Sequence, residues 1–320
     1  MINFTKLEHH SKQTKWADEA DELEWKTSLV GTSPYAASQM DDEIADLFVE
    51  MQSESESDAS FPEVAGETVA ERIDRNLREA TEEIARSENR RDEMTSGVQA
   101  ETERRSRLLG DEYPFLRLAG SLSFRGADTP GRRIYMDCLR TSVAPSAADR
   151  EAFEDLVAKA LEAYLGKGRA SVRVFGWQAK AEADRPRRIK EMIKMLETAS
   201  GEWRWNPDSD SGFPDDPPTT LVKDLGLDAI GWLPMPDNRD GKLFLLAQCA
   251  TGQTNWDEKL NDVSWERIKN WIRPLPDAWT IRCFAIPFHL PNEARWKEVS
   301  DRGGLFLDRT RLTLLLKESP

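Results

Sequence analysis

Apolar residues follow a helical spacing over one long segment in the middle of the chain. From Phe153 to Tyr164 they recur at intervals of three and one, which keeps one helix face apolar for three turns. Ser146 precedes this run with Asp149 three residues later, which is the pattern of a capping box. Gly166 follows the run and is expected to end the helix. This is the clearest helix that the sequence predicts.

Short apolar segments after this helix indicate strands. The segment 242–250 is apolar on both faces until Gln248, which predicts a central strand covered on both sides. Other strands are expected at 170–177, 227–232 and 279–286, and a last strand or short helix at 305–316. Helices are expected at 185–198, 221–226, 256–260 and 264–272, a turn at 236–241 and a loop at 206–218. The order of these elements predicts a mixed α/β core over residues 146–316.

The segment 67–108 predicts one long helix or a helix pair. Charges of both signs interleave along it, and its apolar stripe is thin. Ile73, Leu77, Ala80 and Ile84 lie 4, 3 and 4 residues apart, as in a heptad seam. We therefore expect it to pack as an antiparallel hairpin or against a second copy of the chain in a homodimer.

Residues 113–145 are expected to form a β-hairpin joining region. Tyr113–Leu118 and Arg133–Leu139 read as its two strands, with 125–131 as the turn. The division that follows is an acidic, mainly helical N-terminal region at 1–112, this joining region, and a domain at 146–320.

The charge is concentrated at one end of the chain. Residues 1–120 hold 28 acidic and 14 basic residues, whereas residues 121–320 hold 30 of each, so the whole net charge of −14 lies in the front part. The stretch 41–67 contains ten acidic residues and no Lys or Arg, and we expect a flexible segment there. It is either a solubilising loop or an acidic mimic of nucleic acid that shields a basic partner.

Composition excludes several classes of protein. No apolar run approaches the ~18–20 residues that span a bilayer, and the N-terminus lacks an apolar signal core. Three widely spaced cysteines do not make a disulfide framework, so a cytoplasmic location is expected. No GxxxxGK[ST] sequence is present, so an energy-driven step would need a partner protein that supplies ATPase or sensing activity.

The best candidate for chemistry is the pair Asp228 and Gln248. Each is the polar interruption of an apolar strand, and the two strands are joined by a turn. A carboxylate and an amide oxygen, helped by a backbone carbonyl, suit Mg²⁺ or Mn²⁺, which can polarise a phosphodiester and activate water. The alternative is that Asp228 caps a turn and Gln248 satisfies a sheet edge.

Asp228, the hairpin, Gln248-Cys249-Ala250 and the upstream capped helix with Glu154 resemble the PD-(D/E)XK nuclease superfamily. The resemblance covers residues 146–290 and implies a restriction-endonuclease-like mixed-sheet core flanked by helices. It implies that Asp228, Gln248 and the Cys249 backbone carbonyl are metal ligands, with Glu154 as an additional acid and Glu151 as its substitute.

One position departs from the pattern of this superfamily. Ala250 stands where the motif has a lysine that stabilises the attacking hydroxide and the developing charge. Some members place this lysine on the following helix, and Lys259 would take that role here. The alternative is that Lys259 is an ordinary exposed lysine. The chain would then have a nuclease-like fold that binds nucleic acid without cleaving it.

A nucleic-acid substrate needs a basic surface. The predicted helix 185–198 supplies one that could bind phosphates, and tryptophans further along the chain could stack bases or, more in keeping with their size, fill the core. The basic residues of the helix are Arg185, Arg187, Arg188, Lys190 and Lys194, and the tryptophans are Trp256, Trp265, Trp271 and Trp279.

The function expected is that of a Mg²⁺-dependent endonuclease acting on DNA, which by resemblance serves restriction or anti-phage defence. The acidic segment 41–67 would then restrain it. The first alternative is a catalytically inactive nuclease-like subunit that binds nucleic acid or acts as a scaffold in a defence complex. The second is a thiol hydrolase that uses Cys249 with His289.

Overall fold

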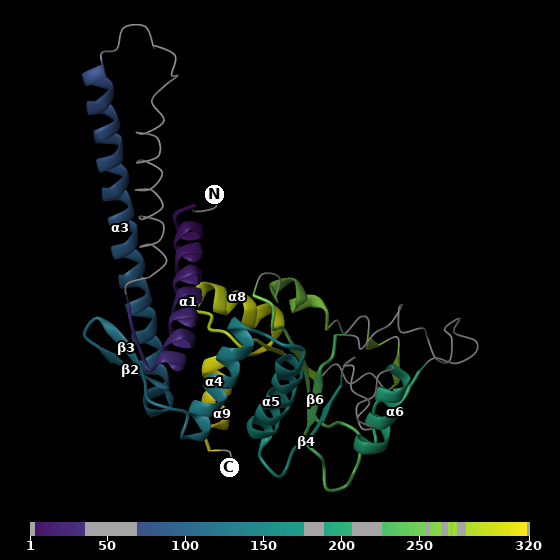
Figure 1. Ribbon diagram of the computed structural model, residues 1–320. Coiled ribbons are helices and arrows are strands. Elements are labelled where there is room, and N and C mark those ends of the chain that lie inside the picture. The colour runs from purple at the N-terminus through teal and green to yellow at the C-terminus, as the bar shows by residue number, and fades with distance from the viewer. Residues whose placement is uncertain are drawn as a thin grey trace.

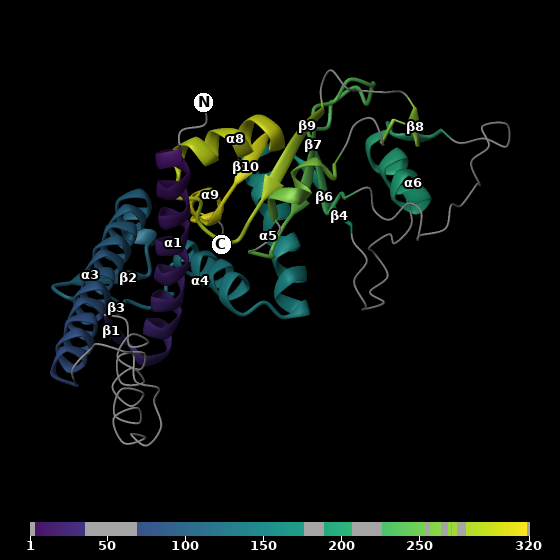
Figure 2. The ribbon, with the colours of Figure 1, turned by 90° about the horizontal axis from the view of Figure 1, so that it is seen from above.

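A five-stranded mixed sheet lies near the centre of the molecule (Figure 1). Its strands follow the order β10-β9-β7-β6-β4 (Figure 2). The computed structural model describes residues 4–35, 69–175, 189–206, 226–253, 256–263, 268–269, 271–273 and 280–318. The strands of this sheet are β4 (Ser171–Val174), β6 (Ala229–Trp232), β7 (Phe244–Cys249), β9 (Thr280–Ala285) and β10 (Leu305–Leu307).

The sheet is antiparallel on one side and parallel on the other. β4 pairs antiparallel with β6 and β6 with β7, whereas β9 is parallel to both β7 and β10. Helix α5 (Ala147–Leu165) precedes β4, and the 3₁₀ helix η2 (Trp256–Asn261) lies between β7 and β9. Every residue of β7 is buried, so the predicted central strand covered on both faces is confirmed.

Helices cover both faces of the sheet (Figure 2). On one face, Leu245, Ala247 and Cys249 pack with α5, α4 (Pro130–Val143) and α9 (Arg309–Leu316). On the other face, Phe244 and Leu246 pack with α6 (Ile189–Ser200) and the strand pair β5 (Arg204–Trp205) and β8 (Ile272–Arg273). Helix α8 (Glu293–Gly303) and η2 cover β9 and β10 on this second face. The side chains therefore alternate between the faces, as the period of a strand requires.

The N-terminal part is a helical unit with its own core. Helices α1 (Phe4–Val30) and α3 (Val69–Leu109) pack together, and α3 extends well past α1 and the other labelled elements (Figure 1). The 3₁₀ helix η1 (Gly110–Glu112) leads to a small sheet of the order β1-β3-β2, formed by Thr32–Pro34, Ser121–Phe124 and Phe115–Leu118. Of the two alternatives for 67–108, the single long helix is correct.

The expected second strand at Arg133–Leu139 is wrong, because this segment lies in α4. Thr129 caps the helix by accepting a hydrogen bond from the Arg132 N–H, and Pro130 occupies its first turn. Tyr135, Cys138, Leu139 and Ser142 are buried along one face at helical spacing. A hairpin does form in the joining region, but β2 pairs with β3 across Ala119-Gly120. Thr129-Pro130, which is expected in the hairpin turn, is therefore the start of a helix.

Other expectations agree with the structure to different degrees. The capping box of α5 is present, 305–316 contains both a strand and a helix, and 256–260 is a 3₁₀ rather than an α-helix. Ile272 belongs to a strand instead of the helix expected at 264–272. Residues 41–67, 207–218, 221–225 and 264–267 lie outside the described residues. No helix in the described ranges combines the length and apolarity needed to cross a membrane.

Candidate functional site

The candidate site lies where strand β6 begins and its antiparallel neighbour β7 ends. The regular β6–β7 pairing stops at Ala229, which lies opposite Ala247. The Asp228 N–H also donates to the Ala247 carbonyl, whereas continued pairing would place Gln248 opposite Asp228. The Asp228 side chain then takes the place of a backbone acceptor, since its Oδ2 accepts a 2.6 Å hydrogen bond from the Cys249 N–H. The carboxylate is half-buried and lies directly against the end of β7.

The Cys249 carbonyl faces the same side as Asp228. The Ala250 N–H donates to Ala285 on β9, at 2.9 Å. In a trans peptide the carbonyl points away from the N–H of the same unit, so the Cys249 carbonyl points away from β9 and toward β6. A carboxylate and a main-chain carbonyl therefore face the same side at this end of the sheet.

Gln248 is buried, and its amide is held by a carboxylate that sequence reasoning missed. Its Nε2 donates to Oδ2 of Asp262 at 3.2 Å. Because the nitrogen is the donor in this pair, the amide oxygen is the atom through which Gln248 could bind a cation. Asp262 follows η2, fourteen residues after Gln248, and no spacing rule would have selected it from the sequence.

Glu154 and Lys259 lie near the same strand end. Burial raises the pKa of the Cys249 thiol well above its ordinary value, the carboxylates of Asp228 and Glu154 raise it further, and Lys259 lowers it. All three charges therefore act on one thiol, which requires them to be near it. Glu154 is half-buried on α5 and Lys259 is exposed on η2. A buried thiol with a raised pKa is a poor nucleophile, so the Cys249 hydrolase is disfavoured.

Ala250 occupies an apolar pocket. It is fully buried and packs in a cluster with Leu260, Phe284 and Ile286. A lysine here would bury its ammonium among apolar side chains, which is costly without a partner. Lys259 directly precedes Leu260, so it lies on the segment that covers Ala250.

The donor set at this sheet end suits a hard cation. Asp228, Glu154 and the Gln248 and Cys249 carbonyl groups all offer oxygen donors of the kind that Mg²⁺ prefers. Gln248 points to the face of β7 that η2 and Asp262 cover, whereas Glu154 lies on α5 at the opposite face. Within the described residues, no three His, Cys, Asp or Glu side chains converge as a metal cluster. Mg²⁺ is commonly held by one or two carboxylates, with water and substrate phosphate completing its coordination, and the residues present fit that kind of site.

The basic helix is described only in part. Lys194 is exposed on α6, and the Lys190 Nζ lies 5.7 Å from the centre of the Trp205 ring. Ile189, Met192, Ile193 and Leu196 of the same helix are buried. Arg185, Arg187 and Arg188 lie outside the described residues, as do Trp265 and Trp279. Trp271 is buried and Trp256 packs against Phe284 and Phe288, so both contribute to the core.

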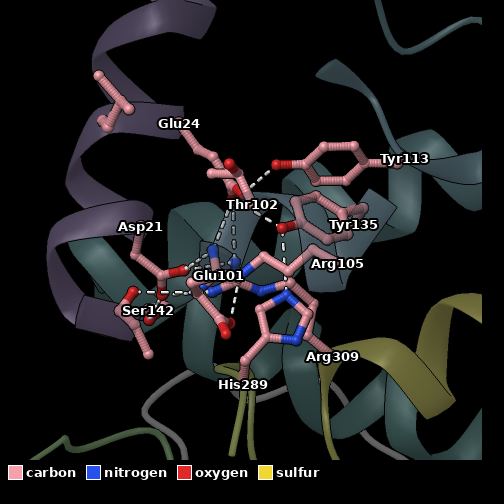
Figure 3. Close-up of polar contacts among 12 residues, drawn as sticks. Asp21, Glu24, Glu101, Thr102, Arg105, Tyr113, Tyr135, Ser142, His289 and Arg309 are labelled. Atoms are coloured by element: carbon pink, nitrogen blue, oxygen red, sulfur yellow. Dashed lines mark hydrogen bonds and ion pairs between the residues drawn. The ribbon is translucent and has the colours of Figure 1, made fainter. Parts of the chain in front are cut away.

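A second polar cluster, missed from the sequence, is buried between the N-terminal helices and α9 (Figure 3). Arg105 of α3 and Arg309 of α9 are both fully buried, and both pair with Asp21 and Glu24 of α1. Glu101 also pairs with Arg105, at 2.8 Å. Burial opposes ionisation of Asp21, but the two guanidinium groups hold its pKa below the ordinary value. The cluster has the character of a structural ionic lock.

Two tyrosines and a histidine complete this ionic lock. The hydroxyls of Tyr113 and Tyr135 donate to the two oxygens of Glu24, at 2.6 and 2.7 Å. The His289 Nε2 lies 3.1 Å from the Tyr135 hydroxyl and its Nδ1 3.0 Å from the Thr310 hydroxyl. Burial, together with Arg105 and Arg309, lowers the pKa of His289 well below its ordinary value, so the ring is neutral.

The ionic lock is connected to the segment that leaves the candidate site. The Gln253 Nε2, four residues after Cys249, donates to the carbonyl and hydroxyl oxygens of Ser142, at 3.2 and 3.0 Å. The Ser142 hydroxyl in turn donates to Asp21 at 2.9 Å. A continuous chain of hydrogen bonds therefore joins α1 to the segment between Ala250 and Lys259.

Comparison of this chain with protein-family models, with curated proteins and with solved structures gives no match.

Proposed function

We propose that this protein is a metal-dependent nuclease that cleaves DNA phosphodiesters. The observation that carries the proposal is the 2.6 Å hydrogen bond from the Cys249 N–H to Asp228, because it holds a carboxylate beside the Cys249 carbonyl and next to Gln248. The element order supports it as well. A capped helix, three strands that pair antiparallel in the order β4-β6-β7, a helical turn and the parallel strand β9 occur in this order along the chain, with α6 and β5 inserted between β4 and β6 and β8 before β9. A restriction-endonuclease-like core has the same succession without these insertions.

Three groups at the end of β7 would hold the cation: the Asp228 carboxylate, the Gln248 amide oxygen and the Cys249 carbonyl. Glu154, which the resemblance adds as a further acid, lies on α5 at the opposite face from Gln248 and would reach the cation only at the edge of the sheet. Mg²⁺ or Mn²⁺ bound there would polarise the phosphodiester and lower the pKa of a bound water. The Lys259 ammonium would stabilise the negative charge that develops on the phosphate, in place of the lysine absent at Ala250.

The basic residues in and before α6 would bind the substrate. Lys190 and Lys194 on α6, with Arg185, Arg187 and Arg188 before them in the sequence, would contact DNA phosphates. A role in restriction or anti-phage defence follows from the same resemblance, and a partner protein would supply any ATPase or sensing step. Homodimerisation through α3 would bring two such sites together for cleavage of both strands.

Plasmid cleavage in the presence of Mg²⁺ or Mn²⁺ tests the proposal. Asp228→Asn retains an acceptor for the Cys249 N–H but removes the charge, so it should fold normally and lose at least about a hundredfold in rate. Asp240→Asn, in the exposed turn at the other end of the same two strands, is the matched control. Cleavage that persists in Asp228→Asn would show that the site is assigned wrongly.

A second candidate is a catalytically inactive nuclease-like subunit that binds nucleic acid or assembles a complex. The burial of Ala250 among apolar side chains favours it, because the motif lysine has no place there. This candidate predicts DNA binding that depends on Lys190 and Lys194, without cleavage by the wild-type protein under any metal condition. Measuring DNA affinity and cleavage on the same preparations separates the two functions.

A further inference from the structure

Asp262 contacts three separate parts of the candidate site. Its Oδ2 accepts the hydrogen bond from the Gln248 amide, at 3.2 Å. Its main-chain N–H donates to the Lys259 carbonyl at 2.9 Å. Its Cβ and main chain lie directly against Gly226, two residues before Asp228.

The Cβ and main chain of Asp262 lie close to Gly226. A Cβ added at Gly226 would lie 3.0 Å from the Asp262 Cβ and 3.3 Å from its carbonyl carbon. Gly226 also has a φ of +74°, which favours glycine. The segment before β6 is therefore packed closely against the turn after η2 at Asp262, a residue that is otherwise exposed to solvent.

The hydrogen bond to the Asp262 carboxylate determines how the Gln248 amide is oriented. An amide can present either its oxygen or its nitrogen, and only the oxygen can bind a cation. The carboxylate of Asp262 accepts hydrogen bonds but has no proton to donate when it is ionised, so it holds the amide nitrogen. The amide oxygen of Gln248 then points away from Asp262 and is the atom that would bind the cation.

We propose that Asp262 is a positioning residue that orients Gln248 for cation binding and anchors the Lys259 turn beside it. This inference depends on the proposed function. Groups that orient a metal ligand typically alter metal affinity or activity by ~10–100-fold when they are removed. In this proposal Asp262 acts on the cation through Gln248 and on the phosphate through the Lys259 turn.

Mn²⁺ affinity, measured by calorimetry on the full-length protein, is the primary readout, and plasmid cleavage is the second. Asp262→Ala should weaken Mn²⁺ binding by ~10–100-fold. Asp262→Asn retains an oxygen that can accept from the Gln248 amide, and its affinity should remain within about threefold of wild type. Asp257→Ala is the control, because Asp257 lies on η2 but pairs with Arg295. Thermal unfolding of each variant separates orientation from loss of fold.

The Gln248→Ala background gives an independent test. If Asp262 acts on the cation through Gln248, then Asp262→Ala should not weaken Mn²⁺ binding further once Gln248 is removed. Additive effects, or Mn²⁺ affinity unchanged in Asp262→Ala, would overturn the positioning role. An Asp262→Asn variant as weak as Asp262→Ala would also overturn it, since the charge would then act directly on the cation.

Failure of the proposed function gives a different pattern. If wild type neither binds Mn²⁺ nor cleaves, both proposals are wrong. If wild type binds Mn²⁺ with a dependence on Asp228 but not on Asp262, only the positioning role is wrong.

Discussion

Arg309 in the last helix forms a double hydrogen bond with Asp21 in the first helix. The distances are 2.9 Å from Nη1 to Oδ1 and 2.7 Å from Nη2 to Oδ2, and both side chains are buried. The two residues are 288 positions apart in the chain. The ends of the sequence are thus joined through charges inside the molecule.

Replacing Arg309 by methionine should strongly destabilise the protein. The variant leaves Asp21 with Arg105 as its remaining charged partner, and Glu24 loses one of its two cations. Breaking a buried ion pair by removing one partner costs about 3–5 kcal/mol. The free energy of unfolding, measured in urea, tests this value. Arg302→Met is the control, because Arg302 pairs with Glu298 at the surface and should cost at most about 1 kcal/mol.

The C-terminal domain should not fold without the helical N-terminal region. A fragment of residues 146–320 would lack Asp21, Glu24 and Arg105, so Arg309 would be left without its charged partners. We expect low helicity by circular dichroism and rapid digestion by protease, in contrast to the full-length chain. A protease-resistant fragment with a cooperative unfolding transition would contradict this expectation.

His289 should make stability depend on pH below its ordinary pKa of about 6.5. The folded protein keeps His289 neutral, whereas the unfolded chain binds a proton there, so stability is lost as pH falls below that value. The loss from one proton is at most about 1.4 kcal/mol per pH unit. Arg105 and Arg309 lower the pKa of His289, and Tyr135, Thr310 and Asp308 lie close to it.

His289→Gln isolates this contribution, because glutamine can hydrogen bond but does not titrate. The comparison with wild type is needed since Asp18 acts in the opposite direction: burial raises its pKa to about 6, so it adds stability as pH falls. Unfolding free energies at pH 7.5 and 5 should show a smaller loss in the variant. Equal losses in both proteins would show that His289 titrates normally in the fold.

Lys259→Ala should reduce cleavage without reducing Mn²⁺ affinity. The ammonium is proposed to stabilise charge that develops in the transition state, and removing such a group typically costs ~10²–10³ in rate. Single-turnover cleavage at saturating metal measures this directly. Lys297→Ala, an exposed lysine on α8, is the control. If Lys259→Ala cleaves as fast as the control, the charge that develops in the transition state is stabilised by another residue.

Much of the sheet could be predicted because its signals are local. The capping box at Ser146 and Asp149 and the continuous apolarity of 242–250 depend only on nearby residues, and both are found in the structure. The second strand of the joining region was wrong for a related reason. Arg133–Leu139 has an apolar pattern that suits either period, and the cap at Thr129 decides in favour of a helix.

The candidate site could be predicted only as far as strand pairing allows. Asp228 and Gln248 follow from two strands joined by a turn, but Asp262 reaches Gln248 through the packing of Gly226. The ionic lock was beyond prediction for the same reason. Its charged members, Asp21, Glu24, Arg105 and Arg309, look like ordinary surface residues in the sequence, and only long-range packing buries them.

The Asp228 carboxylate closes the β6–β7 ladder as an acceptor for the Cys249 N–H, independently of any cation. Selection for folding alone would therefore retain an acceptor at this position in a descendant that had lost catalysis. An aspartate here would then be a poor marker of activity among diverged copies of the gene. Gln248 and Lys259, which have no comparable role in the ladder, would be the first positions to drift.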